Sequence, residues 1–126
     1  TTPTTPTTPA PSATAAQIIA YAKTFQGVPY VWGGSTPSGF DCSGFVQPVF
    51  AKQGVKLPRT VSQQKAAVRQ TSKTSLRPGD LVFYGSYHVG VYVGNGYIVD
   101  APSSGRMVSK RKMWSGSRTY GTLRPA

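Results

Sequence analysis

Glutamate is absent from this 126-residue chain, and cysteine and histidine each occur once. A single cysteine excludes an intramolecular disulfide. One cysteine, one histidine and three aspartates also leave few ligands for a four-coordinate zinc site, so no metal and no cofactor are expected. No apolar run approaches the ~20 residues of a membrane span. If the chain uses thiol chemistry, there is one candidate for the nucleophile and one for its base.

The charge balance is strongly one-sided, with 14 Lys and Arg against 3 acidic residues and a net charge of +11. Such a surface attracts polyanions and repels other copies of itself, which favours a monomer. Nucleic acid fits the charge alone, but the chain has no recognition motif for it. Membrane binding lacks a basic amphipathic helix. Neither partner is therefore expected.

The chain divides into a short linker and one domain. Residues 1–13 are rich in Thr and Pro, a composition that cannot bury a core and predicts an extended or disordered linker. Thr/Pro tracts are typical of stalks in exported proteins, but a plain spacer is the preferred interpretation. Residues 14–126 have the length of a single domain. Thr14 and Gln17 have the spacing of a capping box, which predicts a helix from Thr14 to Phe25.

The remaining pattern predicts helices first and strands afterwards. Two further helices are expected over 42–53 and 61–68, with Phe45, Val46, Val49 and Phe50 facing inward. Short β-type runs then follow at 81–84, 89–93, 97–101, 107–109 and 119–123, separated by turn residues. Short connections imply antiparallel hairpins. The fold class is therefore α+β, with helices packed on a central antiparallel sheet.

Cys42 lies at the predicted start of the second helix. Asp41 is a good N-cap residue, which places the sulfur near free backbone N–H groups and the positive end of the helix dipole. Both favour the thiolate, and the same N–H groups could hold an oxyanion. The flanking glycines indicate an exposed site, and Gly44 would let a substrate backbone approach. The alternative is an inert buried cysteine.

His88 and Asp100 are the predicted partners of Cys42. Alternation along the 88–93 strand sets His88 apart from the apolar side. If Gly94-Asn95-Gly96 is a three-residue hairpin loop, Asp100 faces Gly90 and reaches His88 on the diagonal. Asp100 would then orient the imidazole and stabilise its cation. The alternatives are a structural histidine and a solvent-facing aspartate. The third acidic residue, Asp80, lies in a predicted turn before a strand, and a structural role is expected for it.

Six ordered elements together resemble the NlpC/P60 family of bacterial cell-wall cysteine peptidases. They are Pro29-Tyr30-Val31-Trp32-Gly33-Gly34, Asp41-Cys42-Ser43-Gly44-Phe45-Val46, Leu57-Pro58-Arg59-Thr60, Arg77-Pro78-Gly79-Asp80-Leu81-Val82-Phe83, His88-Val89-Gly90-Val91-Tyr92-Val93-Gly94 and Asp100-Ala101-Pro102. The resemblance covers roughly residues 14–126. It implies a minimal papain-like fold and hydrolysis of peptidoglycan stem peptides between D-γ-glutamate and a diamino acid by a secreted, wall-acting enzyme.

The same resemblance implies a site. Cys42, His88 and Asp100 would be catalytic, and Tyr30, Trp32, Asp41 and Ser43 would line the substrate cleft. The family's third catalytic position is most often histidine, so Asp100 is a departure. The basic cluster Arg106, Lys110, Arg111 and Lys112 could engage anionic wall polymers. Two other hypotheses about function remain open. The domain could be a non-catalytic wall-binding module, or a thiol amidase or transpeptidase acting on peptidoglycan.

Overall fold

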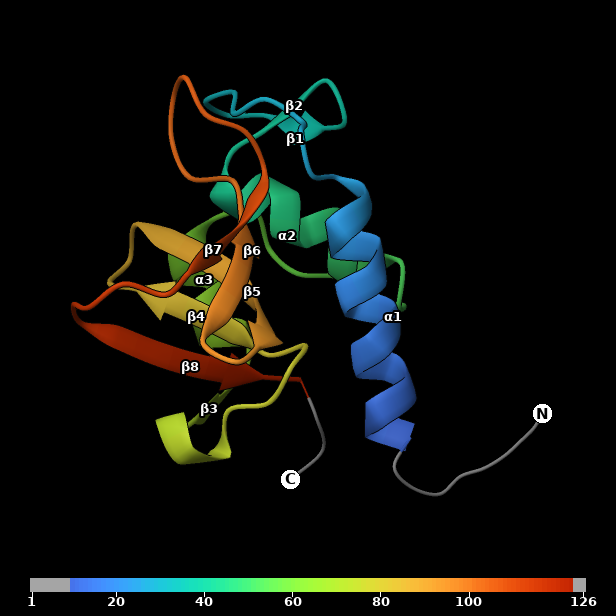
Figure 1. Ribbon diagram of the computed structural model, residues 1–126, viewed down its shortest axis with the longest axis vertical. Helices are drawn as coiled ribbons and strands as arrows, with labels where there is room; N and C mark the ends of the chain where they lie inside the picture. Colours follow the sequence, from blue (N-terminus) through green and yellow to red (C-terminus); the bar gives the residue numbers. More distant parts are fainter. Residues whose placement is uncertain (1–9, 124–126) are drawn as a thin grey trace.

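A six-stranded antiparallel sheet forms the centre of the computed structural model, which describes residues 10–123 (Figure 1). The strand order is β3-β8-β4-β5-β6-β7, so β3 and β7 are the edge strands. The strands are β3 (Arg69–Thr71), β4 (Leu81–Tyr84), β5 (His88–Gly94), β6 (Tyr97–Asp100), β7 (Ser109–Lys112) and β8 (Arg118–Thr122). A separate two-stranded ribbon pairs β1 (Ser35–Thr36) with β2 (Gly39–Phe40). The predicted α+β class is confirmed.

Three α-helices accompany the sheet: α1 (Ala10–Thr24), α2 (Cys42–Ala51) and α3 (Val61–Ala67). Figure 1 shows α1 running along one side of the molecule, with α2 above the sheet and α3 behind it. A 3₁₀ turn, η1 (Lys73–Ser75), precedes β4. None of the helices in residues 10–123 is long and apolar enough to cross a bilayer.

The two faces of the sheet carry different side chains because residues alternate along each strand. The helix-facing side presents Leu81, Phe83, Val89, Val91 and Val99 to the main core. The four α2 residues predicted to face inward are all buried in this core: Phe45, Val46, Val49 and Phe50. The opposite face carries a smaller cluster of Val82, Tyr84, Ile98 and Tyr120, packed against Met113 and Trp114. The candidate site lies where α2 meets the sheet.

Some predicted boundaries differ from the structure. Helix α1 begins at Ala10, so Thr14 lies inside it and the predicted capping box is wrong. Pro11 falls in the first turn, where a missing N–H costs no helical hydrogen bond. The predicted linker therefore overlaps α1 at residues 10–13, and its first nine residues lie outside the described part. The strand expected at 107–109 runs instead from Ser109 to Lys112 and therefore includes Arg111.

Candidate active site

Cys42 is the first residue of α2, and Asp41 caps that helix as predicted. The Asp41 carboxylate accepts a hydrogen bond from the Gly44 N–H at 2.7 Å, an interaction that contributes about 1 kcal/mol in typical helices. The cysteine is only 8% exposed, so the expectation of an exposed residue is wrong. Its Sγ donates a long 3.7 Å hydrogen bond to the Tyr87 carbonyl. The thiol therefore lies under the turn that precedes His88.

Gly44 has a different role from the one predicted. A side chain on Gly44 would place its Cβ 2.0 Å from the Gly34 carbonyl oxygen. The Gly34 oxygen in turn accepts from the Asp41 N–H at 2.9 Å. Gly44 thus makes room for the β1–β2 ribbon over the start of α2, rather than for a substrate backbone.

The His88 ring joins Cys42 to Asp100. His88 Nε2 lies 2.7 Å from Asp100 Oδ2, and the Cys42 side chain interacts with the imidazole closely enough to raise the pKa of His88. Both His88 and Asp100 are buried, and Asp100 is 0% exposed. The structure therefore brings together all three residues that the sequence predicted as nucleophile, base and orienting acid.

The β5–β6 hairpin places Asp100 on the His88 face by a route that the sequence only partly indicated. The predicted register is confirmed, since Val91 pairs with Val99 and Tyr92 with Ile98. The loop, however, has two residues, Asn95 and Gly96, both at positive φ, and a bulge between Tyr92 and Gly94 restores the register. The bulge supplies the extra residue that the prediction had assigned to the loop.

Gly90 opens the space that the His88–Asp100 contact needs. A side chain at Gly90 would place its Cβ 2.9 Å from Ile98 Cδ1 and 3.2 Å from Asp100 Cβ. Glycine here lets the imidazole and the carboxylate meet across the diagonal of the strand pair.

Arg111 is a member of the site that the sequence reasoning missed. It donates from Nε to Asp100 Oδ1 at 2.9 Å and from Nη2 to Asp100 Oδ2 at 2.6 Å. Asp100 pairs with Ser109, so Arg111 is its diagonal neighbour on β7 and points inward, whereas Lys110 and Lys112 are exposed. Arg111 therefore does not belong to the predicted polymer-binding surface. The alternation of β7 could have indicated this had its boundaries been predicted correctly.

Trp114 covers this ion-pair network. Its ring lies 4.7 Å from the Arg111 guanidinium and 5.5 Å from the His88 ring, and it stacks on Tyr84 at 3.9 Å. The Tyr84 hydroxyl donates to the Trp114 carbonyl at 3.0 Å and accepts from the Trp114 backbone N–H at 3.1 Å. These contacts fix the indole over the histidine and separate the buried charges from solvent on that side.

The charges around His88 favour its cationic form. Burial lowers the pKa of His88, but the hydrogen bonds and charges of Asp100 and Cys42 outweigh it and raise the pKa to about 9. Burial alone would raise the pKa of Asp100, because it disfavours the charged carboxylate. Hydrogen bonds from His88 and Arg111 instead hold that pKa below its usual range. The arrangement can therefore hold an imidazolium beside a sulfur nucleophile at neutral pH.

This pKa shift predicts a pH-dependent stability. Because the folded-state pKa of His88 lies above its unfolded value of ~6.5, its contribution is complete below that pH and is lost as the pH rises through about 9. The free energy of unfolding should fall by about 3 kcal/mol across this window through this group. Urea unfolding at a series of pH values measures the change. A His88→Gln variant should lack this component, and an equal slope in both proteins would contradict the assignment.

A second ionic cluster lies on the other side of the nucleophile. Arg59 donates to both Asp41 oxygens, at 3.0 and 2.8 Å, and to the Ser43 hydroxyl at 2.9 Å. Burial raises the pKa of the Tyr30 hydroxyl, and the charges of Cys42 and Asp41 raise it further against the opposing effect of Arg59. Tyr30, Asp41 and Ser43 are thus gathered beside Cys42, as predicted.

Arg59 was not among the predicted site residues, although it lies in one of the quoted motifs. Its side chain is part-exposed and ties the Leu57–Thr60 loop to the start of α2. Gln64 on α3 adds a buried contact by donating to the Ser43 carbonyl at 3.0 Å.

Trp32 differs from Tyr30, Asp41 and Ser43, the other predicted substrate-binding residues. Its side chain is 84% exposed, and no contact within the described residues places it against Cys42. No cluster of metal-ligating residues occurs in the described residues.

A cysteine at a helix start, with a histidine and a carboxylate on an antiparallel sheet, is the arrangement of papain-like thiol peptidases. A family model described as "NlpC/P60 family" matches residues 27–123. The chain belongs to the NlpC/P60 family.

Named relatives share this domain but are longer proteins. The probable endopeptidase p60 of Listeria innocua is 48% identical over 92 residues, which cover 70% of this chain and 20% of the relative. The bifunctional muramidase/DL-endopeptidase CwlT of Bacillus subtilis is 45% identical over 103 residues, covering 75% of this chain and 31% of the relative. The chain thus spans less than a third of the length of either relative.

Solved structures show the same architecture. The NlpC/p60 domain of the peptidoglycan hydrolase SagA has a TM-score of 0.81 and 36% identity, covering 86% of this chain and 98% of that one. RipD of Mycobacterium tuberculosis, described as a non-catalytic NlpC/p60 protein adapted to peptidoglycan binding, has a TM-score of 0.79 and 26% identity, covering 88% and 98%. Both hydrolytic and binding functions are therefore attached to this fold.

Proposed function

We propose that this domain is a peptidoglycan endopeptidase that hydrolyses stem peptides by a thiol mechanism. The observation that carries the proposal is the buried contact chain from Cys42 through His88 to Asp100, with 2.7 Å between His88 and Asp100. The relatives named endopeptidase and DL-endopeptidase support the reaction class. The bond between D-γ-glutamate and a diamino acid is the proposed point of cleavage.

The reaction assigns a step to each residue. The Cys42 thiolate attacks the scissile carbonyl, and the Cys42 N–H, which has no acceptor within the first helical turn, stabilises the oxyanion. The imidazolium of His88 protonates the leaving amine and forms the neutral base that activates water against the thioester. Asp100 keeps Nε2 engaged, so Nδ1 faces the sulfur and the substrate. Tyr30, Trp32, Asp41 and Ser43 form the proposed substrate-binding wall.

Location and partners follow from the substrate. Peptidoglycan lies outside the cell membrane, so the domain is proposed to act as a secreted protein at the cell wall. Anionic wall polymers are proposed to contact the exposed Lys110 and Lys112 of β7. We further propose that the domain acts as a monomer.

A defined disaccharide-tetrapeptide tests the function and separates its alternatives. The endopeptidase should release a dipeptide that begins with the diamino acid, identified by mass spectrometry. A free muramic acid lactyl group would indicate an amidase instead. Binding of the muropeptide without any product would place this domain with the non-catalytic relatives.

Arg111 is proposed as a positioning residue that acts through Asp100. Replacing Arg111 by glutamine removes two charge-assisted hydrogen bonds, worth ~1.5–3 kcal/mol in comparable cases, so kcat should fall about ten- to a hundredfold. The pKa of His88 should rise, because a neighbouring cation is lost, and the alkaline limb of the rate profile should move to higher pH. Arg111→Lys should recover part of the rate.

Arg77→Gln is the matched control, because it makes the same change at an exposed arginine in the turn before β4. It should leave both kcat and the pH profile unchanged. A merely structural role for Arg111 would lower stability without moving the alkaline limb, and that result would overturn the positioning role.

A further inference from the structure

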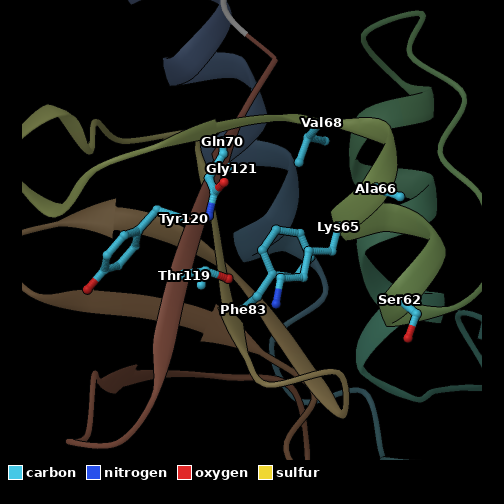
Figure 2. A pocket seen from close by; sticks show the side chains of 9 residues that line it. All are labelled: Ser62, Lys65, Ala66, Val68, Gln70, Phe83, Thr119, Tyr120 and Gly121. Carbon is cyan, nitrogen blue, oxygen red and sulfur yellow. The ribbon is translucent and has the colours of Figure 1, made fainter.

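A cavity lies between α3 and the β8 side of the sheet, with a volume of about 330 Å³ (Figure 2). Its walls come from α3, the start of β3, β4 and β8, and it is lined by Ser62, Lys65, Ala66, Val68, Gln70, Phe83, Thr119, Tyr120 and Gly121. This volume is at the small end of the ~300–1,000 Å³ of ligand pockets, which suits a group of one or two amino-acid residues.

The cavity is separate from the candidate active site. Phe83 and Tyr84 are consecutive on β4 and therefore point to opposite faces of the sheet. Tyr84 stacks on Trp114 beside His88, whereas Phe83 lines the cavity on the helix side. No residue of the Cys42–His88–Asp100 contact chain lines it.

Lys65 supplies a cation that no salt bridge within residues 10–123 neutralises. It is half-buried, whereas the six other lysines of the chain are exposed. Figure 2 shows its side chain reaching from α3 toward Phe83 and Thr119. Asp41 pairs with Arg59, and Asp100 pairs with His88 and Arg111, whereas no salt bridge within the described residues reaches Lys65. An ammonium without an internal counter-ion at the wall of a cavity can bind an external anion.

Thr119 supplies an unused hydrogen-bonding group at the same place. Its Oγ1 is buried and has no hydrogen-bond partner among the described residues. Thr119 lies directly opposite Phe83 in the β4–β8 register, so its hydroxyl and the Phe83 ring border one space. A buried hydroxyl without a partner costs about 1–3 kcal/mol, and a ligand oxygen would remove that cost.

We propose that this cavity binds the free carboxylate end of a short peptide. The Lys65 ammonium pairs with the carboxylate, the Thr119 hydroxyl donates to one of its oxygens, and the terminal side chain packs on Phe83. The combination of one cation, one hydroxyl and an apolar floor favours an organic carboxylate over inorganic phosphate, which has no apolar part. This site does not rest on the proposed hydrolysis.

Amide chemical shifts measured by NMR on the wild-type chain test the proposal with N-acetyl-D-alanine as the probe. Saturable shifts should appear at Ala66, Thr119, Tyr120 and Gly121, with a dissociation constant on the order of 1 mM. The neutral N-acetyl-D-alaninamide should bind at least tenfold more weakly, as should inorganic phosphate. Lys65→Met should weaken binding of the acid at least tenfold, whereas Lys56→Met, at an exposed lysine, should not.

Thr119→Val separates binding from folding. Valine has the same shape and removes only the unpartnered hydroxyl, so the melting temperature of the free protein should stay the same or rise while the acid binds more weakly. Equal binding of the acid and the amide, equal binding of phosphate, or unchanged binding in Lys65→Met would overturn the proposal. So would a lower melting temperature with unchanged binding in Thr119→Val.

Discussion

Replacing Cys42 by alanine is expected to lower peptide hydrolysis by at least about 10⁴-fold, because no other residue can form the thioester. The chain has one cysteine, so no neighbouring thiol can substitute for it. The fold should be retained, since the sulfur makes one long hydrogen bond, to the Tyr87 carbonyl, and otherwise interacts electrostatically with the His88 ring. Hydrolysis of a defined muropeptide and circular dichroism of the same sample measure both quantities.

Ser86→Ala is the matched control for this variant. Ser86 is an exposed residue of the turn before His88, and its loss should leave the rate unchanged. Residual hydrolysis by pure Cys42→Ala above about a thousandth of the wild-type rate would rule out Cys42 as the nucleophile.

Replacing Asp100 by alanine should lower kcat about a hundredfold or more, within the range of general acid–base effects. The imidazole would lose its orienting partner and the charge that raises the pKa of His88. The same change leaves Arg111 without its carboxylate, and breaking a buried ion pair typically costs about 3–5 kcal/mol. Rates are therefore measured at a temperature where each variant is folded, as verified by its unfolding curve.

The conservative variants distinguish catalysis from stability. Asp100→Asn keeps an acceptor for His88 Nε2 and should retain part of the rate, and Asp100→His should do the same. In Asp100→Asn the pKa of His88 should fall, so the alkaline limb should move to lower pH, opposite to the shift expected for Arg111→Gln. A wild-type rate for Asp100→Ala would show that Asp100 does not orient the histidine.

Local patterns in the sequence predicted most of the site because its positions depend on short-range geometry. Asp41 capping α2 and the diagonal between His88 and Asp100 follow from neighbouring residues and from one hairpin. The hairpin loop was predicted one residue too long, but the bulge between Tyr92 and Gly94 supplied the same residue count. Asp100 therefore lies on the predicted face for a different local reason.

Long-range packing could not be predicted in the same way. The inward direction of Arg111 depends on the register in which β7 pairs with β6, and a shift of one residue would reverse every side chain of that strand. The contact of Gly44 with Gly34 depends on how the β1–β2 ribbon folds over α2. The approach of Arg59 to Asp41 joins residues 18 positions apart through a loop without periodicity. The bidentate contacts of both arginines became visible only in three dimensions.

The two arginine–aspartate pairs give the nucleophile and the base separate supports. Arg59 holds Asp41 at the start of α2, and Arg111 holds Asp100 beside His88. Two of the three acidic residues of a chain with a net charge of +11 are thus placed within one site. This use of scarce carboxylates supports the proposal that the site is catalytic, because neither pair is needed to fill the apolar core.

Covalent labelling of Cys42 tests the central proposal most directly. A stem-peptide analogue that ends in a D-γ-glutamyl diazomethyl ketone presents an electrophilic carbon next to the position of the scissile carbonyl. We expect one label per protein on the Cys42 sulfur, located by mass spectrometry, with slower labelling in His88→Ala and protection by an intact muropeptide. Label on another residue, or no label while the same protein still cleaves the muropeptide, would contradict a thiol mechanism centred on Cys42.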